Sequence, residues 1–173
     1  IKKAGFDEFF TLYDDEGCEL TFKEQCVFAS SLGLKCTMIH GKYNSSDLHC
    51  FWENGKQGDD VCNFYIRQIK ECSGLTDNIV VHLNADVNQK QTAIGLSRIT
   101  KMLKACEKYN INLCIENAES EKEIPYIFSK INHERLKICF DIGHKNCFTP
   151  NLDVLNKYGN FVQVLHLHDN HGE

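Results

Sequence analysis

The stretch "TAIGLSRITKMLKACEKYNINLCIEN" (92–117) contains two hydrophobic patterns in succession. Over 92–110 the apolar residues recur every three or four positions, which predicts a long helix. Over 111–117 they form a short, nearly continuous apolar run that ends in a glutamate, which predicts a buried β-strand. A helix that leads directly into a buried strand is part of the repeating unit of a parallel α/β sheet.

The same alternation extends along the whole chain. Strands are predicted at 6–12, 35–40, 78–83, 111–117, 136–142 and 161–167, and helices at 21–33, 58–72, 92–110, 121–132 and 152–158. Strands that are almost entirely apolar are typical of parallel sheets covered on both faces. So many consecutive units predict a (β/α)8 TIM barrel of the α/β class. A doubly wound open sheet is the alternative, but no GxGxxG or Walker-type loop follows any strand.

The length of the chain bears on how much of such a barrel it contains. A TIM barrel typically needs about 250 residues, whereas this chain has 173. It opens with "IKKAGFDEFF" (1–10), which predicts the last turn of a helix, a glycine C-cap and then a strand. We therefore expect one incomplete barrel domain over 1–173, comprising strands two to seven. Two uncovered sheet edges would tend to pair with another chain, which makes the protein a candidate homo-oligomer.

Composition excludes some classes of function. The net charge is -5, which gives no general attraction to a phosphate backbone. No apolar run approaches the roughly 18 residues that a membrane span requires, so no membrane partner is expected. The ten cysteines include no CxxC pair, so a zinc ribbon or thioredoxin-like motif is not indicated. We interpret them as small hydrophobic residues of a reduced core, which predicts a cytoplasmic protein.

A polar residue recurs at the carboxyl end of successive predicted strands. These residues are His40, His82, Glu116, Asp141 and His166. Because the carboxyl ends of barrel strands converge on one face, the five side chains are expected to meet there. Imidazoles and carboxylates are ligands for divalent metals, and His144 follows Asp141 closely enough for a tight turn to bring it to the same cluster.

The residues below these ends support the same geometry. Two positions before each candidate ligand stands an apolar residue on the same strand face. These residues are Met38, Val80, Cys114, Cys139 and Val164. The pattern predicts an apolar interior layer beneath a polar site.

An ordered set of short strings makes the chain resemble a known superfamily. The strings are "GFDEFF", "MIHGKY", "VVHL", "CIEN", "FDIGH" and "LHLHDN", and together they resemble the xylose isomerase-like TIM barrels, which include sugar isomerases, sugar epimerases and the AP endonuclease family 2 type. The resemblance implies that Glu116, Asp141 and His166 hold a divalent metal (Mn, Zn, Co or Mg). It implies that His144 binds substrate in isomerases or a further zinc in endonucleases. His40 and His82 match positions that hold zinc or line the sugar site.

The leading functional hypothesis is a metal-dependent isomerase or epimerase of a sugar or sugar phosphate. In it, Glu116 is one catalytic proton-transfer base and the reaction passes through an enediolate. Tyr43 and Trp52 are candidates for an apolar wall against the sugar ring, with ordinary loop packing as the alternative. By resemblance, the family continues past "HDN" into a further loop and a strand that carries a second glutamate.

Two alternatives belong to other classes. The first is a zinc-dependent AP endonuclease that cleaves DNA at abasic sites. The loops at the expected site carry five lysines against eight acidic residues, which argues against DNA as a partner because duplex affinity depends on phosphate contacts. The second is a non-catalytic remnant that retains the barrel without the chemistry.

Overall fold

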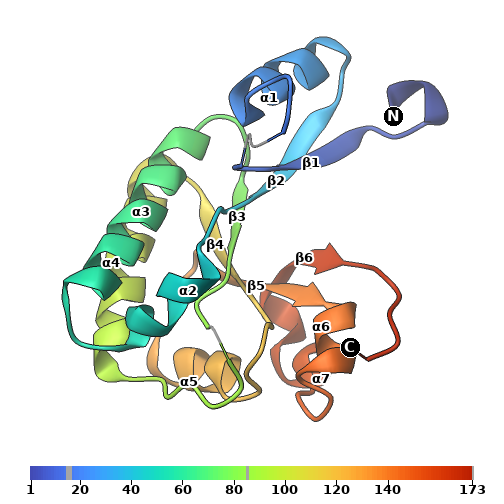
Figure 1. Ribbon diagram of the computed structural model, residues 1–173. Coiled ribbons are helices and arrows are strands. Elements are labelled where there is room, and N and C mark those ends of the chain that lie inside the picture. The colour runs from blue at the N-terminus through green and yellow to red at the C-terminus, as the bar shows by residue number, and fades with distance from the viewer. Residues whose placement is uncertain (15–16, 85, 173) are drawn as a thin grey trace.

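Six β-strands form one sheet in the computed structural model, which describes residues 1–14, 17–84 and 86–172 (Figure 1). Each strand pairs in parallel with the next one along the chain. The strands are β1 (Glu8–Leu12), β2 (Lys35–His40), β3 (Asn78–Val81), β4 (Asn112–Glu116), β5 (Leu136–Asp141) and β6 (Val162–His166). All six lie within the runs for which the sequence predicts strands.

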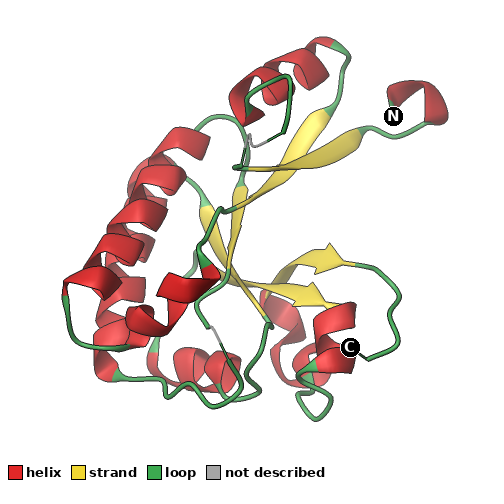
Figure 2. Ribbon diagram, in the orientation of Figure 1, coloured by secondary structure: helices red, strands yellow, loops and turns green. Residues whose placement is uncertain are grey.

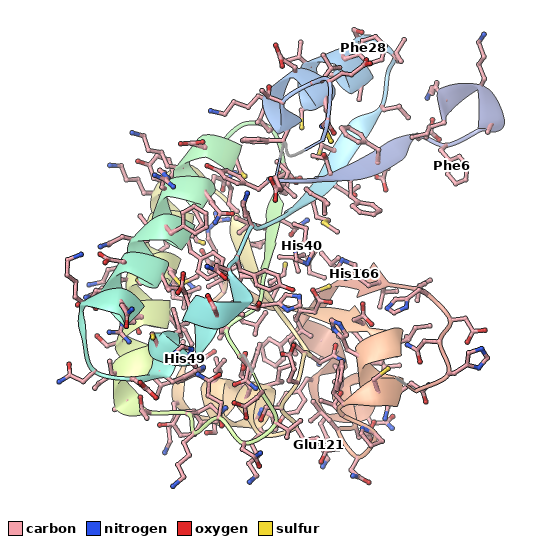
Figure 3. All side chains as sticks on the ribbon, viewed as in Figure 1. Phe6, Phe28, His40, His49, Glu121 and His166 are labelled. Atoms are coloured by element: carbon pink, nitrogen blue, oxygen red, sulfur yellow. The ribbon has the colours of Figure 1, made fainter. Side chains whose placement is uncertain are left out.

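The sheet is curved, and the site residues themselves demonstrate the curvature. Strands β2 and β6 are four steps apart in the sheet, which in a flat sheet would separate them by about 19 Å. The ring centroids of His40 on β2 and His166 on β6 are only 5.8 Å apart, and both labels lie close together in Figure 3. The strands therefore bend around a common axis, which confirms the predicted partial TIM barrel.

The helices follow the strands in the expected alternation. They are η1 (Lys2–Ala4), α1 (Phe22–Ser31), α2 (Ser45–Leu48), η2 (His49–Trp52), α3 (Lys56–Cys72), α4 (Ala93–Tyr109), α5 (Glu123–Lys130), α6 (Ile142–Cys147), α7 (Val154–Tyr158) and η3 (Gly159–Phe161), where η denotes a 3-10 helix. Figure 2 shows the long helices α3 and α4 side by side on one side of the strands. No helix among the described residues is long and apolar enough to cross a membrane.

Local capping explains where the principal helices begin and end. Thr21 and Glu24 form a reciprocal capping box at the start of α1, in which each side chain accepts from the other residue's backbone N–H. Thr92 caps α4 by accepting from the N–H of Gly95. The same helix ends at Asn110, whose φ of 56° is a left-handed conformation that asparagine tolerates.

Three segments differ from the sequence prediction. The stretch after β2, where the sequence predicts no helix before residue 58, contains α2 and η2. β3 ends at Val81, so His82 lies one residue beyond the strand. The turn expected after Asp141 is the six-residue helix α6, because the Asp141 side chain caps it by accepting from the N–H of His144 at 2.7 Å.

The core confirms the packing role of the cysteines and of the predicted interior layer. None of the ten cysteines, all of which lie among the described residues, forms a disulfide, and eight are buried. Met38, Val80, Cys114 and Cys139 form one buried cluster, and Val164 packs against it. These are the five residues that strand parity places two positions before the candidate ligands.

A buried arginine forms hydrogen bonds that hold the loop containing α2 and η2 in place. Arg98 on α4 is 2% exposed. Its guanidinium donates to the carbonyl oxygens of Cys50, Phe51, Glu53 and Gly55 and to the carboxylate of Asp59. These hydrogen bonds satisfy the buried charge and hold the loop against α4.

The curved sheet is open between its two edge strands. A cavity of about 690 Å³ lies on this side, with residues of β1, β2 and β6 in its lining. Phe10 and Leu12 on β1 and Leu165 on β6 are more than half exposed. These residues lie on the two uncovered sheet edges that the sequence analysis anticipated.

Candidate metal centre

Glu116 lies at the centre of the predicted strand-end cluster and faces four imidazoles. Its Oε2 lies 3.2 Å from Nε2 of His40 and 3.0 Å from Nε2 of His82. Its Oε1 lies 3.1 Å from Nδ1 of His144 and 3.1 Å from Nδ1 of His166. The four histidines come from elements far apart in the sequence, and the curvature of the sheet brings them to one carboxylate.

The electrostatics of this cluster follow from burial and from its neighbours. Glu116 is 2% exposed, and burial alone would raise the pKa of its carboxyl. The surrounding imidazoles outweigh burial and hold that pKa well below its usual range. The same interaction raises the pKa of His144, and for His166 it outweighs burial, which acts to lower the pKa. Glu116 is therefore an anion at neutral pH.

Asp141 contributes the second carboxylate of the site. One of its oxygens lies 3.4 Å from Nδ1 of His166, so the three residues that the resemblance implies as metal ligands are adjacent. The carboxylate also lies 3.0 and 3.2 Å from Nε2 of His168. Sequence analysis did not single out His168. Its position two residues after His166, on the same face if the strand is extended, was the available signal.

Both ring nitrogens of His40 face oxygen atoms that can only accept hydrogen bonds, which requires a second proton on the ring or a cation beside it. Its Nδ1 lies 3.0 Å from the carbonyl oxygen of Gly41 and its Nε2 faces the Glu116 carboxylate. A neutral imidazole has only one N–H, so one nitrogen would present a lone pair to an acceptor. A metal ion bound by Nε2 removes this conflict, and a carbonyl partner for the other nitrogen is the usual second contact of a ligating histidine.

Other atoms of the cluster also fit a metal ion. The donor atoms form three groups of close ligands: His40, His82 and Glu116; Glu116, Asp141 and His144; and Glu116, Cys139 and His166. The buried Nδ1 of His82 and Nε2 of His166 have no hydrogen-bond partner among the described residues. Nitrogen and carboxylate donors suit Zn, Mn and Co, and the carboxylates also suit Mg.

The two candidate wall residues lie in different places. The ring of Tyr43 stacks on His82, with centroids 4.5 Å apart and an interplanar angle of 15°, so it borders the cluster. Trp52 is 1% exposed and its Nε1 donates to the carbonyl of Leu83 at 2.7 Å. Trp52 is therefore part of the core, and the alternative of ordinary loop packing describes it.

A curved parallel α/β sheet with candidate metal ligands at its carboxyl ends defines a partial barrel with a candidate metal centre. Residues 1–173 match the family described as "Xylose isomerase-like TIM barrel". The chain belongs to this family. No curated protein matches it.

Solved structures share the fold at low sequence identity. A D-tagatose 3-epimerase-like protein has a TM-score of 0.76 and 20% identity, covering 99% of this chain and 71% of that one. A 3-keto-D-glucoside 4-epimerase from E. coli has a TM-score of 0.73 and 16% identity, covering 99% and 72%. An IOLI protein with a bound zinc atom has a TM-score of 0.73 and 14% identity, covering 97% and 65%.

Proposed function

We propose that this protein is a divalent-metal-dependent isomerase or epimerase of a sugar or sugar phosphate. The observation that carries the proposal is the buried Glu116 carboxylate, which four imidazoles surround at the carboxyl ends of the strands. The names of two similar structures, a tagatose 3-epimerase-like protein and a ketoglucoside 4-epimerase, support a sugar as the substrate.

In this proposal Glu116, Asp141 and His166 hold the metal, and His40, His82 and His144 line the substrate site or hold a further ion. A bound divalent ion would polarise a carbonyl and an adjacent hydroxyl of the sugar. The lowered pKa of Glu116 leaves its carboxylate unprotonated at neutral pH. In this proposal that carboxylate is the group that accepts the proton from a neighbouring carbon.

Tyr43 supplies the wall of the proposed sugar site. Tyr43 is 36% exposed and its ring stacks on His82, so in this proposal the exposed part of the residue contacts the apolar side of a sugar ring. Burial raises the pKa of its hydroxyl, and the negative charges of Glu119 and Glu116 act in the same direction. The hydroxyl is therefore protonated at neutral pH and can donate a hydrogen bond to a substrate oxygen.

A second candidate is a zinc-dependent phosphodiesterase of the AP endonuclease type. It is favoured by the division of the ligands into two pairs, with His40 and His82 on one oxygen of Glu116 and His144 and His166 on the other. A carboxylate with ligands on both oxygens is suited to bridging two ions, and paired metals are common in phosphodiester hydrolysis. The acidic surface loops argue against this candidate.

Elemental mass spectrometry on the purified protein, with His166→Ala as control, tests both candidates. About one divalent ion per chain, lost in the variant, supports the isomerase, and exchange of a ketose C–H proton with D2O followed by NMR tests the reaction. Two or three zinc ions per chain, together with cleavage of an abasic-site duplex, would contradict the isomerase and support the phosphodiesterase. Metal binding without either activity would favour the non-catalytic remnant.

A further inference from the structure

The side chain of Asn117 bridges the ends of two neighbouring strands inside the metal centre. Asn117 follows Glu116 directly and is 1% exposed. Its Nδ2 donates to the carbonyl oxygen of Asp141 at 2.9 Å, and its Oδ1 accepts from the backbone N–H of Asp141 at 2.8 Å. One amide thus satisfies both backbone groups of a candidate metal ligand.

The Asn117 side chain takes the place of one backbone hydrogen bond between β4 and β5. The N–H of Asn117 donates to the carbonyl of Cys139 at 3.4 Å, which continues the ladder between β4 and β5. In a regular parallel pair the next bond would run from the N–H of Asp141 to the backbone carbonyl of Asn117. The chain turns at this point, where the N–H of Ala118 donates to the carbonyl of Glu116, and the side-chain oxygen takes the position of the backbone oxygen.

The same side chain reaches the segment that follows α6, the helix that carries His144. Its Nδ2 lies 3.5 Å from Oγ1 of Thr149, which is fully buried. Thr149 in turn donates from its backbone N–H to the carbonyl of His144 at 3.2 Å. Asn117 therefore connects the segments of three candidate ligands without contributing an atom to the ligand set.

We propose that Asn117 is the positioning residue of the metal centre, locking Glu116 and Asp141 at the spacing that a divalent ion requires. Partners that orient metal ligands typically contribute 10- to 100-fold to metal affinity. Asn117 acts through backbone atoms and not on the ligand side chains, so it fixes the two strand ends themselves. The inference rests on the proposed metal site.

Isothermal titration calorimetry with MnCl2 and with ZnCl2 tests this role, because it reads metal affinity separately from activity. Asn117→Ala is expected to weaken binding by about 10- to 100-fold relative to the wild type. Asn78→Ala is the matched control. Asn78 is also a buried side-chain amide that joins strands, because it donates to the carbonyl of Thr37 and accepts from Asn112. It lies at the amino end of β3, whereas the candidate metal centre lies at the carboxyl ends of the strands.

The control separates positioning from general stability. We expect Asn78→Ala to lower the urea midpoint while keeping metal affinity within about twofold of the wild type. Should Asn117→Ala be insoluble, Asn117→Ser retains a polar group and decides the question by the same titration. Wild-type affinity in the Asn117 variant would overturn the inference alone, whereas a wild-type protein that binds neither metal would overturn the proposed function as well.

Discussion

Glu123 supplies a pH-dependent contribution to stability that the structure allows to be calculated. It is 4% exposed at the start of α5, and neither of its carboxylate oxygens has a partner among the described residues. Burial, and then the nearby charge of Glu119, raise its pKa from 4.5 to about 8. Because the folded protein holds this proton more tightly, the folded state is favoured below pH 4.5 and loses that advantage as the pH rises to 8.

The size of the loss follows from the separation of the two pKa values. A difference of about 3.5 units corresponds to about 5 kcal/mol, at roughly 1.4 kcal/mol per unit. Glu123→Gln keeps the shape and cannot ionise. The variant is therefore expected to match the wild type near pH 4.5 and to become more stable than it by up to about 5 kcal/mol at pH 8 and above.

Urea unfolding measured at several values between pH 5 and pH 9 checks this expectation. Trp52 is the one tryptophan of the chain and is buried, so its fluorescence reports the transition. Glu134→Gln, which removes the same charge from an exposed position, is the control and should follow the wild type. A stability difference between Glu123→Gln and the wild type that is the same at pH 5 and pH 9 would refute the reasoning.

Three further outcomes are expected from the same unfolding assay. Mn²⁺ at 100 times its Kd should raise the free energy of unfolding by about 2.7 kcal/mol, and this gain should vanish in Glu116→Gln; an undiminished gain in the variant contradicts the site. Arg98→Ala leaves buried carbonyl oxygens without a donor and should lower the free energy of unfolding by about 3–5 kcal/mol. A loss below about 1 kcal/mol would contradict the role of Arg98 in holding the loop of α2 and η2. Gly95→Ala would place a Cβ 2.1 Å from Cε3 of Trp52, so it should lower the free energy of unfolding by about 1–3 kcal/mol and shift the Trp52 fluorescence emission to the red. The control is Gly159→Ala, whose Cβ meets nothing within 4 Å and which should change stability by less than about 0.5 kcal/mol.

Much of the site could be predicted because strand geometry is local. A side chain at the carboxyl end of a parallel strand lies at the same edge as its counterparts on the other strands, so His40, Glu116 and Asp141 could be grouped from sequence. Period-two alternation also placed Met38 and Cys114 in the layer beneath. Trp52 was harder to assign, because a loop aromatic can face either a ligand or the core, and only the packing of η2 against α4 decides between them.

By itself, the sequence determined the alternation of strands and helices, the residues at the strand ends and the apolar layer below them, since each depends on the periodicity of a single element. The tertiary structure decided that Glu116 is the residue on which four imidazoles converge, that His168 reaches Asp141, and that the Asn117 amide joins two strand ends. These contacts join residues from different elements. They depend on how far the sheet curves and on where each loop turns back, which the packing of the whole chain fixes.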